Sequence, residues 1–253
     1  MDFLVETALL THGLTSISDG MLLESWGSTQ KNIVWVDHGK ICIGDMSEYL
    51  PFRKRAPQLL RIDCEMLENA LAKKLSGALT ASGTMAVCAK MDIRMAVTCG
   101  MGGIGNIEGE EICPDLPALE QLPVILIATS PKDMLLRKET FSWLKHHGVK
   151  IAGCRNMEST GYLFKSETVP LDGILSEFII KPPMLIINEI PSSRRVQDLS
   201  ILEEAVLSGL EALSRGEYYH PAVNEKIDRL TLGYSSKLQL DALIQNVQLA
   251  VSL

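Results

Sequence analysis

The chain reads Ile93-Arg94-Met95-Ala96-Val97-Thr98-Cys99-Gly100-Met101-Gly102-Gly103-Ile104-Gly105, an apolar strand-like run that enters a glycine-rich turn. A second apolar run, Val124–Ala128, places Lys132 just past its carboxyl end. Glycines let a backbone come close to a ligand. A lysine at the rim of an apolar sheet can have a lowered pKa and act as a nucleophile. Together these features indicate an active site rather than a packing motif.

Apolar strand-like runs and amphipathic helix-like runs alternate on both sides of this stretch, which predicts an α/β protein. Asp37-His38-Gly39 separates two short apolar runs and indicates a hairpin. No low-complexity linker or internal repeat interrupts the pattern, so a single domain over residues 1–253 is expected. Helices are expected at about 62–75, 77–90, 133–147, 195–215, 221–230 and 235–252, and strands at about 93–98, 124–128, 149–153, 160–164 and 184–187.

Composition excludes several classes of protein. The net charge of −7 argues against a nucleic-acid-binding surface, which needs clustered lysine and arginine. No apolar run approaches the roughly 20 residues of a membrane span. The first residues lack the basic start and long apolar run of a signal peptide, and no cysteine pair is spaced as Cys-x-x-Cys. A cytoplasmic protein with reduced thiols is therefore expected.

The glycine turn allows more than one interpretation. Gly100-x-Gly102-Gly103-x-Gly105 follows a strand, as a dinucleotide fingerprint would. However, the next residues do not open a convincing helix, and their carboxylates would repel a pyrophosphate. A turn that shapes another pocket is favoured, and a purely structural turn stays open. The carboxylates beyond it, which can hold a hard cation, are Glu108, Glu110, Glu111 and Asp115.

Two residues far apart in the sequence are candidates for acid–base or nucleophilic chemistry. Lys132 is followed by Asp133, a plausible helix N-cap, and is either solvated or aimed into a cleft. Glu6 interrupts an apolar run. It lies either at a strand edge or in the interior, where burial would raise its pKa toward that of a useful acid.

Other charged residues are expected to have ordinary structural roles. His146 and His147 end a predicted helix and are expected to cap its carboxyl end rather than bind a ligand. Arg194 and Arg195 could hold an anion, but such a pair is expected to be solvated.

Several segments together resemble one known family. Val5–Gly13 resembles its Leu-Glu-Ser-Thr-Ile-Ile-Ser-His-Gly, and Gly77–Met85 its Gly-Ala-Thr-Thr-Val-Ala-Ser-Thr-Met. Thr98–Gly103 resembles Thr-Gly-Gly-Ile-Gly-Gly, and Ala128–Lys132 resembles Ala-Gly-Ala-Lys. Counterparts of residues 148–153 and 188–191 follow in order. By this set the chain resembles the pseudouridine-5′-phosphate glycosidase family, which includes the indigoidine synthase A-like proteins.

The resemblance implies a chemistry and an assembly. The family reversibly cleaves the C–C glycosidic bond of pseudouridine 5′-phosphate to uracil and ribose 5-phosphate, with a divalent metal, usually Mn²⁺. It implies a mixed central sheet flanked by helices, and a homotrimer. Lys132 matches the nucleophile that forms a covalent adduct with C1′ of the sugar. Glu6 matches the proton donor that helps to open the ribose ring, and Glu111 falls where the family has a metal-binding aspartate.

The resemblance also implies substrate contacts, several of them substituted. Arg61 replaces a phosphate-binding lysine, Cys113 a serine, and Gln239 a catalytic-site asparagine. Asp115 matches a carboxylate of the substrate-binding segment, and Ala81 lies in a matching substrate-binding motif. Such changes suit a divergent enzyme with an altered substrate, and equally a relative that is losing activity.

The leading hypothesis is a metal-assisted C-glycosidase that acts on a nucleotide-like sugar phosphate, with pseudouridine 5′-phosphate as the default substrate. One alternative is a catalytically impaired family member that only binds a sugar phosphate. Another is an aldolase-type lyase that uses Lys132 as a Schiff base. A nicotinamide-dependent oxidoreductase is a more distant alternative, because the glycine turn lacks the helix that it needs.

Overall fold

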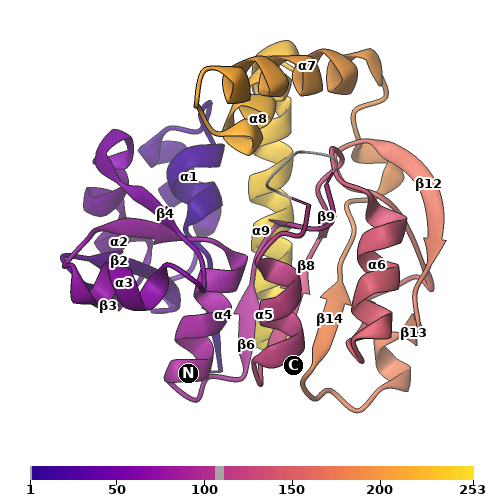
Figure 1. The fold of residues 1–253 in the computed structure, drawn as a ribbon, viewed down its shortest axis with the longest axis horizontal. Helices are drawn as coiled ribbons and strands as arrows, with labels where there is room; N and C mark the ends of the chain where they lie inside the picture. The colour runs from indigo at the N-terminus through magenta and orange to yellow at the C-terminus, as the bar shows by residue number, and fades with distance from the viewer. Residues whose placement is uncertain (1, 106–110) are drawn as a thin grey trace.

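A ten-stranded sheet runs through the protein in the computed structural model, which describes residues 2–105 and 111–253 (Figure 1). Its strands are β1 (Phe3–Val5), β2 (Ile33–Asp37), β3 (Lys40–Gly44), β4 (Leu60–Ile62), β5 (Gly77–Leu79), β6 (Met95–Val97), β8 (Ile125–Ala128), β10 (Lys150–Gly153), β13 (Gly173–Ile174) and β14 (Met184–Ile187). The order is β13-β10-β14-β8-β6-β1-β2-β5-β4, with β3 paired to β2. Pairing is parallel from β13 to β2, whereas β5 is antiparallel to β2, so the predicted mixed sheet is confirmed.

Helices cover both faces of this sheet. They are α1 (Asp19–Trp26), α2 (Met46–Arg53), α3 (Leu67–Ala72), α4 (Ala81–Lys90), α5 (Asp115–Gln121), α6 (Arg137–His146), α7 (Ser200–Ser214), α8 (Tyr219–Leu230) and α9 (Tyr234–Ser252). Side chains alternate between the two faces of a strand. In β1, Phe3 and Val5 therefore join the core under α1, α2, α8 and α9, while Leu4 joins the core under α3 to α6. None of the helices in the described residues is long and apolar enough to cross a membrane.

Shorter elements complete the chain. Two small sheets lie outside the main one: β7 (Gly100–Met101) pairs with β9 (Ser130–Pro131), and β11 (Glu158–Gly161) pairs with β12 (Lys165–Pro170). Leu9–Gly13 forms a π-helix, and three 3₁₀ turns cover Ala56–Gln58, Leu175–Glu177 and Ser192–Arg194. All six cysteines are free thiols.

Several sequence predictions are confirmed. The hairpin forms between β2 and β3 with the two-residue turn His38-Gly39, in which both residues have positive φ (48° and 72°). The buried strand at 184–187 is β14. His146 and His147 cap α6, because a ring nitrogen of each bonds a carbonyl of the last turn at 2.7 Å.

Other predictions are wrong at element boundaries. Residues 77–79 form β5 rather than a helix, because their backbone pairs with β2 and β4, and helix α4 begins only after the N-cap Thr80. Likewise residues 60–62 form β4, which leaves only Leu67–Ala72 helical in the range 62–75. Long-range pairing overrides local propensity at these places.

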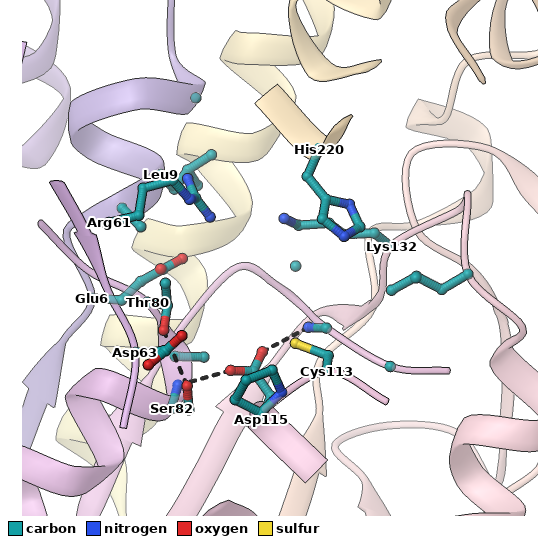
Figure 2. Close-up of a pocket in the computed structure, with 18 of the residues that line it drawn as sticks. Glu6, Leu9, Arg61, Asp63, Thr80, Ser82, Cys113, Asp115, Lys132 and His220 are labelled. Carbon is teal, nitrogen blue, oxygen red and sulfur yellow. Dashed lines mark hydrogen bonds between the residues drawn. The ribbon is translucent and has the colours of Figure 1, made fainter. Parts of the chain in front are cut away.

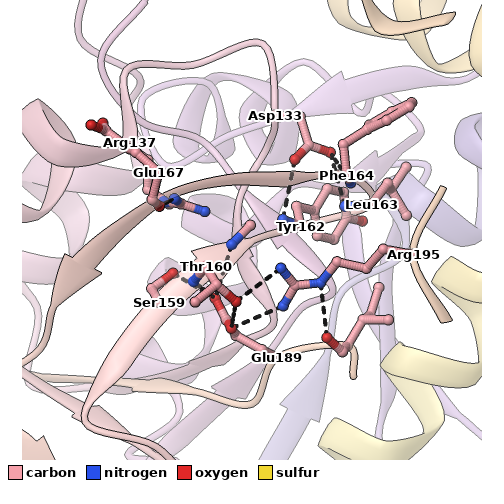
Figure 3. A network of polar contacts seen from close by, with 12 residues as sticks. Asp133, Arg137, Ser159, Thr160, Tyr162, Leu163, Phe164, Glu167, Glu189 and Arg195 are labelled. Carbon is pink, nitrogen blue, oxygen red and sulfur yellow. Dashed lines mark hydrogen bonds and ion pairs between the residues drawn. The ribbon is translucent and has the colours of Figure 1, made fainter. Parts of the chain in front are cut away.

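The predicted surface position is wrong for Arg195, although Arg194 is partly exposed, as predicted. Arg195 is buried and forms an ion pair with Glu189 at 2.9 Å, and its Nε donates to the carbonyl of Ile190 (Figure 3). Glu189 also accepts from Ser159 Oγ (2.6 Å) and from the backbone N–H of Thr160 (2.8 Å). This buried polar network fastens strand β11 to the segment that follows β14.

Replacing Arg195 should therefore destabilise the protein strongly. We expect Arg195→Ala to lower the free energy of unfolding by about 3 kcal/mol, because Glu189 would be left buried without its partner. Arg194, whose side chain is 39% exposed beside Asp241, provides the matched control. Arg194→Ala should cost less than about 1 kcal/mol. Urea denaturation of both variants measures the difference, and equal losses would contradict the assignment.

Candidate active site

A cavity of about 400 Å³ opens where strand ends from two parts of the sheet meet. Glu6 follows β1, Asp63 follows β4 and Thr80 follows β5, and all three line the cavity. Helix α8 contributes His220 and Asn224. Ligands of open α/β sheets bind outside the carboxyl ends of strands where the strand order changes direction. This position makes the cavity the candidate active site.

The cavity brings together residues that are remote in the sequence. Figure 2 shows several of them around an open space, with Glu6 and Arg61 on one side and Cys113 on the other. Every predicted catalytic and substrate-binding residue is among the lining residues: Glu6, Arg61, Ala81, Cys113, Asp115, Lys132 and Gln239. Their roles stay predictions, because position alone does not show what a side chain does. Glu111, the predicted metal ligand, is exposed and lies two positions before Cys113, outside the lining.

Other lining residues were not singled out from the sequence. They are Asp63, Glu65, Tyr162, His220 and Asn224, among others. Each is a single polar residue in an unremarkable local pattern, and only the packing of distant elements places it at the cavity. Asp63 alone had a local signal, since it directly follows a short apolar run.

Glu6 is buried, which decides between the two interpretations of its apolar surroundings. Strand β1 lies between β2 and β6, so the residue that follows it is 5% exposed. Burial raises the pKa of Glu6 to about 7, against the opposing effects of a 2.7 Å hydrogen bond from Thr98 Oγ1 and of the charges of Lys132 and Arg61. Glu6 therefore holds a proton over much of the range below neutral pH.

A short parallel pairing of two strands places Lys132 at the cavity. β7 pairs with β9, and the backbone N–H of Lys132 then donates to the carbonyl of Met101 at 3.2 Å. Burial lowers the pKa of the Lys132 amine, and the positive charge of Arg61 lowers it further, while Glu6 opposes the shift. Lys132 is half-buried and lines the cavity, so of the two alternatives the structure favours a side chain aimed into a cleft. The shifts of Glu6 and Lys132 favour a protonated acid beside a neutral amine, the forms that a proton donor and a nucleophile need.

The glycine turn forms one wall of the cavity. Asp115 accepts the N–H of Gly102 at 2.7 Å and the N–H of Ser82, in the first turn of α4, at 2.8 Å. A Cβ on Gly102 would lie 2.0 Å from Cys113 Sγ, so only glycine fits there. The next helix in the described residues begins at Asp115, which agrees with the low expectation for a dinucleotide fingerprint.

Asp133 does not cap a helix, contrary to prediction. Its carboxylate accepts the backbone N–H groups of Tyr162 (3.1 Å), Leu163 (2.8 Å) and Phe164 (3.3 Å), while α6 begins four residues later (Figure 3). Burial raises the pKa of Asp133 to about 6. Tyr162, held in this way, donates from its hydroxyl to Gln239 Oε1 at 3.1 Å. Asp133, which directly follows Lys132, thus positions Tyr162, and Tyr162 lines the cavity.

Among the described residues, the cavity offers a metal ion few ligands other than single carboxylates. Within residues 2–105 and 111–253, no three histidine, cysteine or acidic residues are grouped so as to hold a metal. Glu108 and Glu110 of the predicted acidic stretch lie outside the described residues. Hard divalent ions of the Mg²⁺ type keep several waters and need only one or two carboxylates plus a substrate phosphate. The described donors fit that hydrated type of binding and not a protein cage.

Comparison with known proteins identifies the family. The model of the family "Indigoidine synthase A like protein" matches residues 6–253. A pseudouridine-5′-phosphate glycosidase of Caldanaerobacter subterraneus subsp. tengcongensis is 27% identical over 98% of this chain and 89% of its own. One of Mesorhizobium japonicum is 26% identical over 98% and 90%. These relatives are enzymes by name.

Solved structures show the same fold. An indigoidine synthase A-like protein of Thermotoga maritima superposes with a TM-score of 0.79 at 19% identity, over 98% of this chain and 90% of that one. The prealnumycin C-glycosynthase AlnA, in complex with ribulose 5-phosphate, superposes with a TM-score of 0.74 at 20% identity, over 98% and 88%. With the family model matched along nearly the whole chain, this protein belongs to the indigoidine synthase A-like family of glycosidase-type enzymes.

Proposed function

We propose that the protein reversibly cleaves the C–C glycosidic bond of pseudouridine 5′-phosphate or a related C-ribosyl compound through a lysine adduct. The observation that carries the proposal is the meeting of Glu6 and Lys132, 126 positions apart in the sequence, in one cavity with opposite pKa shifts. The names of the relatives support the substrate class.

The chemistry follows from the two side chains. Glu6 donates its proton to the ring oxygen of the ribose as the bond from that oxygen to C1′ breaks, and Lys132 Nζ bonds to C1′. The bonded nitrogen then gives up a proton to the Glu6 carboxylate, which passes a proton to the leaving carbon of the base. The nitrogen lone pair forms a C=N bond at C1′ as the bond to the base breaks, and the electrons of that bond take up the proton on the base. Water hydrolyses the iminium, releasing the sugar aldehyde and the free amine.

Removing the nucleophile tests this sequence of steps. Lys132→Ala should abolish turnover of pseudouridine 5′-phosphate, because no other residue supplies the amine to C1′ in the proposed reaction. Borohydride added with the sugar product should fix a sugar on the wild-type protein, detected as added mass on a peptide that contains Lys132. Lys138→Ala, at an exposed position on α6, is the control and should react normally. Substantial residual turnover in Lys132→Ala would reject the nucleophile role.

We also propose a divalent metal, with Mn²⁺ as the first ion to test. Glu111 would hold it through its carboxylate, and when bound such an ion would supply positive charge and orient water. EDTA should abolish turnover and Mn²⁺ should restore it. Glu111→Gln should need a higher Mn²⁺ concentration. Full activity in EDTA would instead favour a metal-independent lyase with the same lysine.

Protonation of Glu6 should affect how the free energy of unfolding depends on pH. Its folded pKa of about 7 lies above the ordinary value of 4.5, so its contribution to stability is complete below pH 4.5 and is lost as pH rises through 7. Wild type should lose up to about 3 kcal/mol from this group over that window. Glu6→Gln should reduce the loss, measured by urea denaturation at pH 5 and pH 8. Asp133 contributes with the same sign, so some slope persists. Glu24→Gln, exposed on α1, should keep the full slope; an unchanged slope in Glu6→Gln would show that Glu6 is ionised.

The homotrimer implied by the resemblance also stays a proposal. Leucines on helix α7 support self-association, because several that point outward are uncovered: Leu207 is 61% exposed, Leu210 45% and Leu213 37%. Exposed apolar surface of this kind is more often an interaction site than polar surface is.

A further inference from the structure

Three buried polar groups meet beside the cavity, although their segments are remote in the sequence. The Tyr162 hydroxyl lies 3.1 Å from Gln239 Oε1 and 3.1 Å from Cys99 Sγ. Gln239 belongs to α9 and lines the cavity together with Tyr162. All three residues are at most 2% exposed, so their hydrogen bonds depend on one another rather than on bulk water.

The protons of this cluster follow from its acceptors. The Cys99 thiol donates to the backbone carbonyl of Gln239 at 3.3 Å. The Tyr162 hydroxyl then has two acceptors within reach, a sulfur atom and the amide oxygen of Gln239, and sulfur is the weaker one. Burial raises the pKa of Cys99 to about 12 and the pKa of Tyr162 well above its ordinary value, so both groups keep their protons at neutral pH. Tyr162 therefore donates to Gln239 Oε1.

Fixing the oxygen of the Gln239 amide also fixes its nitrogen, because the group is planar. Among the described residues, the hydrogen bonds of the Gln239 side chain run through Oε1 alone. The N–H donors of Nε2 are thus left for a ligand in the cavity that Gln239 lines. With the amide reversed, the same position would accept from a ligand instead of donating to it.

Tyr162 is itself held in place. Asp133 accepts its backbone N–H at 3.1 Å (Figure 3). A Cβ on Gly100 would lie 2.7 Å from Tyr162 Cζ, so the ring rests directly on the glycine turn. A side chain locked by packing and hydrogen bonds can orient its neighbour within a binding site.

We propose that Tyr162 is a positioning residue whose hydroxyl orients the Gln239 amide, so that its N–H groups bind an oxygen acceptor of the substrate. The inference rests on the proposed function and adds a group that determines how the substrate is held. Without the hydroxyl, the amide oxygen loses its donor and turns toward the cavity, where a ligand oxygen would be repelled.

A double-mutant cycle on ligand binding tests this role. Calorimetry with pseudouridine 5′-phosphate is carried out in the Lys132→Ala background, which removes the proposed nucleophile. Tyr162→Phe should raise Kd about fivefold, because the amide is no longer held. When Gln239→Ala is also present, the same Tyr162→Phe change should alter Kd by less than about twofold. Equal factors with and without Gln239 would overturn the inference.

A matched variant separates positioning from general stability. Tyr234 lies on the same helix, and its hydroxyl donates to the carbonyl of Arg194, outside the described lining of the cavity. Tyr234→Phe should leave Kd unchanged. Urea denaturation of Tyr162→Phe measures its effect on folding. A loss of stability with no change in Kd would show that the Tyr162 hydroxyl only supports the fold.

Ribose 5-phosphate locates the acceptor on the substrate. If Tyr162→Phe weakens binding of pseudouridine 5′-phosphate and not of ribose 5-phosphate, the oxygen belongs to the base. If it weakens binding of both by the same factor, the oxygen belongs to the sugar phosphate. Either result supports the role of Tyr162, and unchanged binding of both would overturn it.

Binding also separates this inference from the proposed reaction. If wild type binds pseudouridine 5′-phosphate without cleaving it, and the effect of Tyr162→Phe disappears with Gln239→Ala, the reaction is wrong and the positioning role stands. If wild type cleaves the compound and Tyr162→Phe acts independently of Gln239, the reaction stands and the positioning role is wrong.

Discussion

The site depends on the burial of two ionisable groups within reach of each other. Glu6 and Lys132 both lose solvent, and each is shifted toward its neutral form. An exposed glutamate would be ionised and an exposed lysine protonated at neutral pH, and neither could start the proposed reaction. Strand β1 supplies this burial for Glu6, because it runs between two parallel neighbours in the middle of the sheet.

Two carboxylates that do not belong to the proposed chemistry hold the walls of the site. Asp115 joins the first turn of α4 to the glycine turn, and Asp133 gathers three consecutive backbone N–H groups around Tyr162. Both satisfy buried donors that would otherwise destabilise the fold. Asp115 also lines the cavity, so part of the scaffold that shapes the site is within reach of a ligand.

Local sequence patterns correctly predicted the elements that are determined by local interactions. The strand at 184–187 is an unbroken apolar run, and the turn at His38-Gly39 needs residues that tolerate positive φ. Predictions failed where contact with a residue remote in the sequence determines the local structure. Gly77–Leu79 is a strand only because β2 and β4 lie beside it, Asp133 turns toward β11 rather than α6, and Arg195 is buried because Glu189 lies opposite. Local pattern alone singled out Glu6, Lys132 and Asp115 among the predicted cavity residues. The resemblance added the other four, Arg61, Ala81, Cys113 and Gln239.

By itself, the sequence determined the class of fold and the family and named Glu6 and Lys132 as candidates, because motif order and apolar periodicity are properties of the chain. Tertiary structure alone decided that Glu6 and Lys132 line one cavity, and that Asp115 joins the first turn of α4 to the glycine turn. The physical reason is that pKa values and side-chain contacts depend on distances and desolvation between groups remote in the chain, which no local pattern encodes.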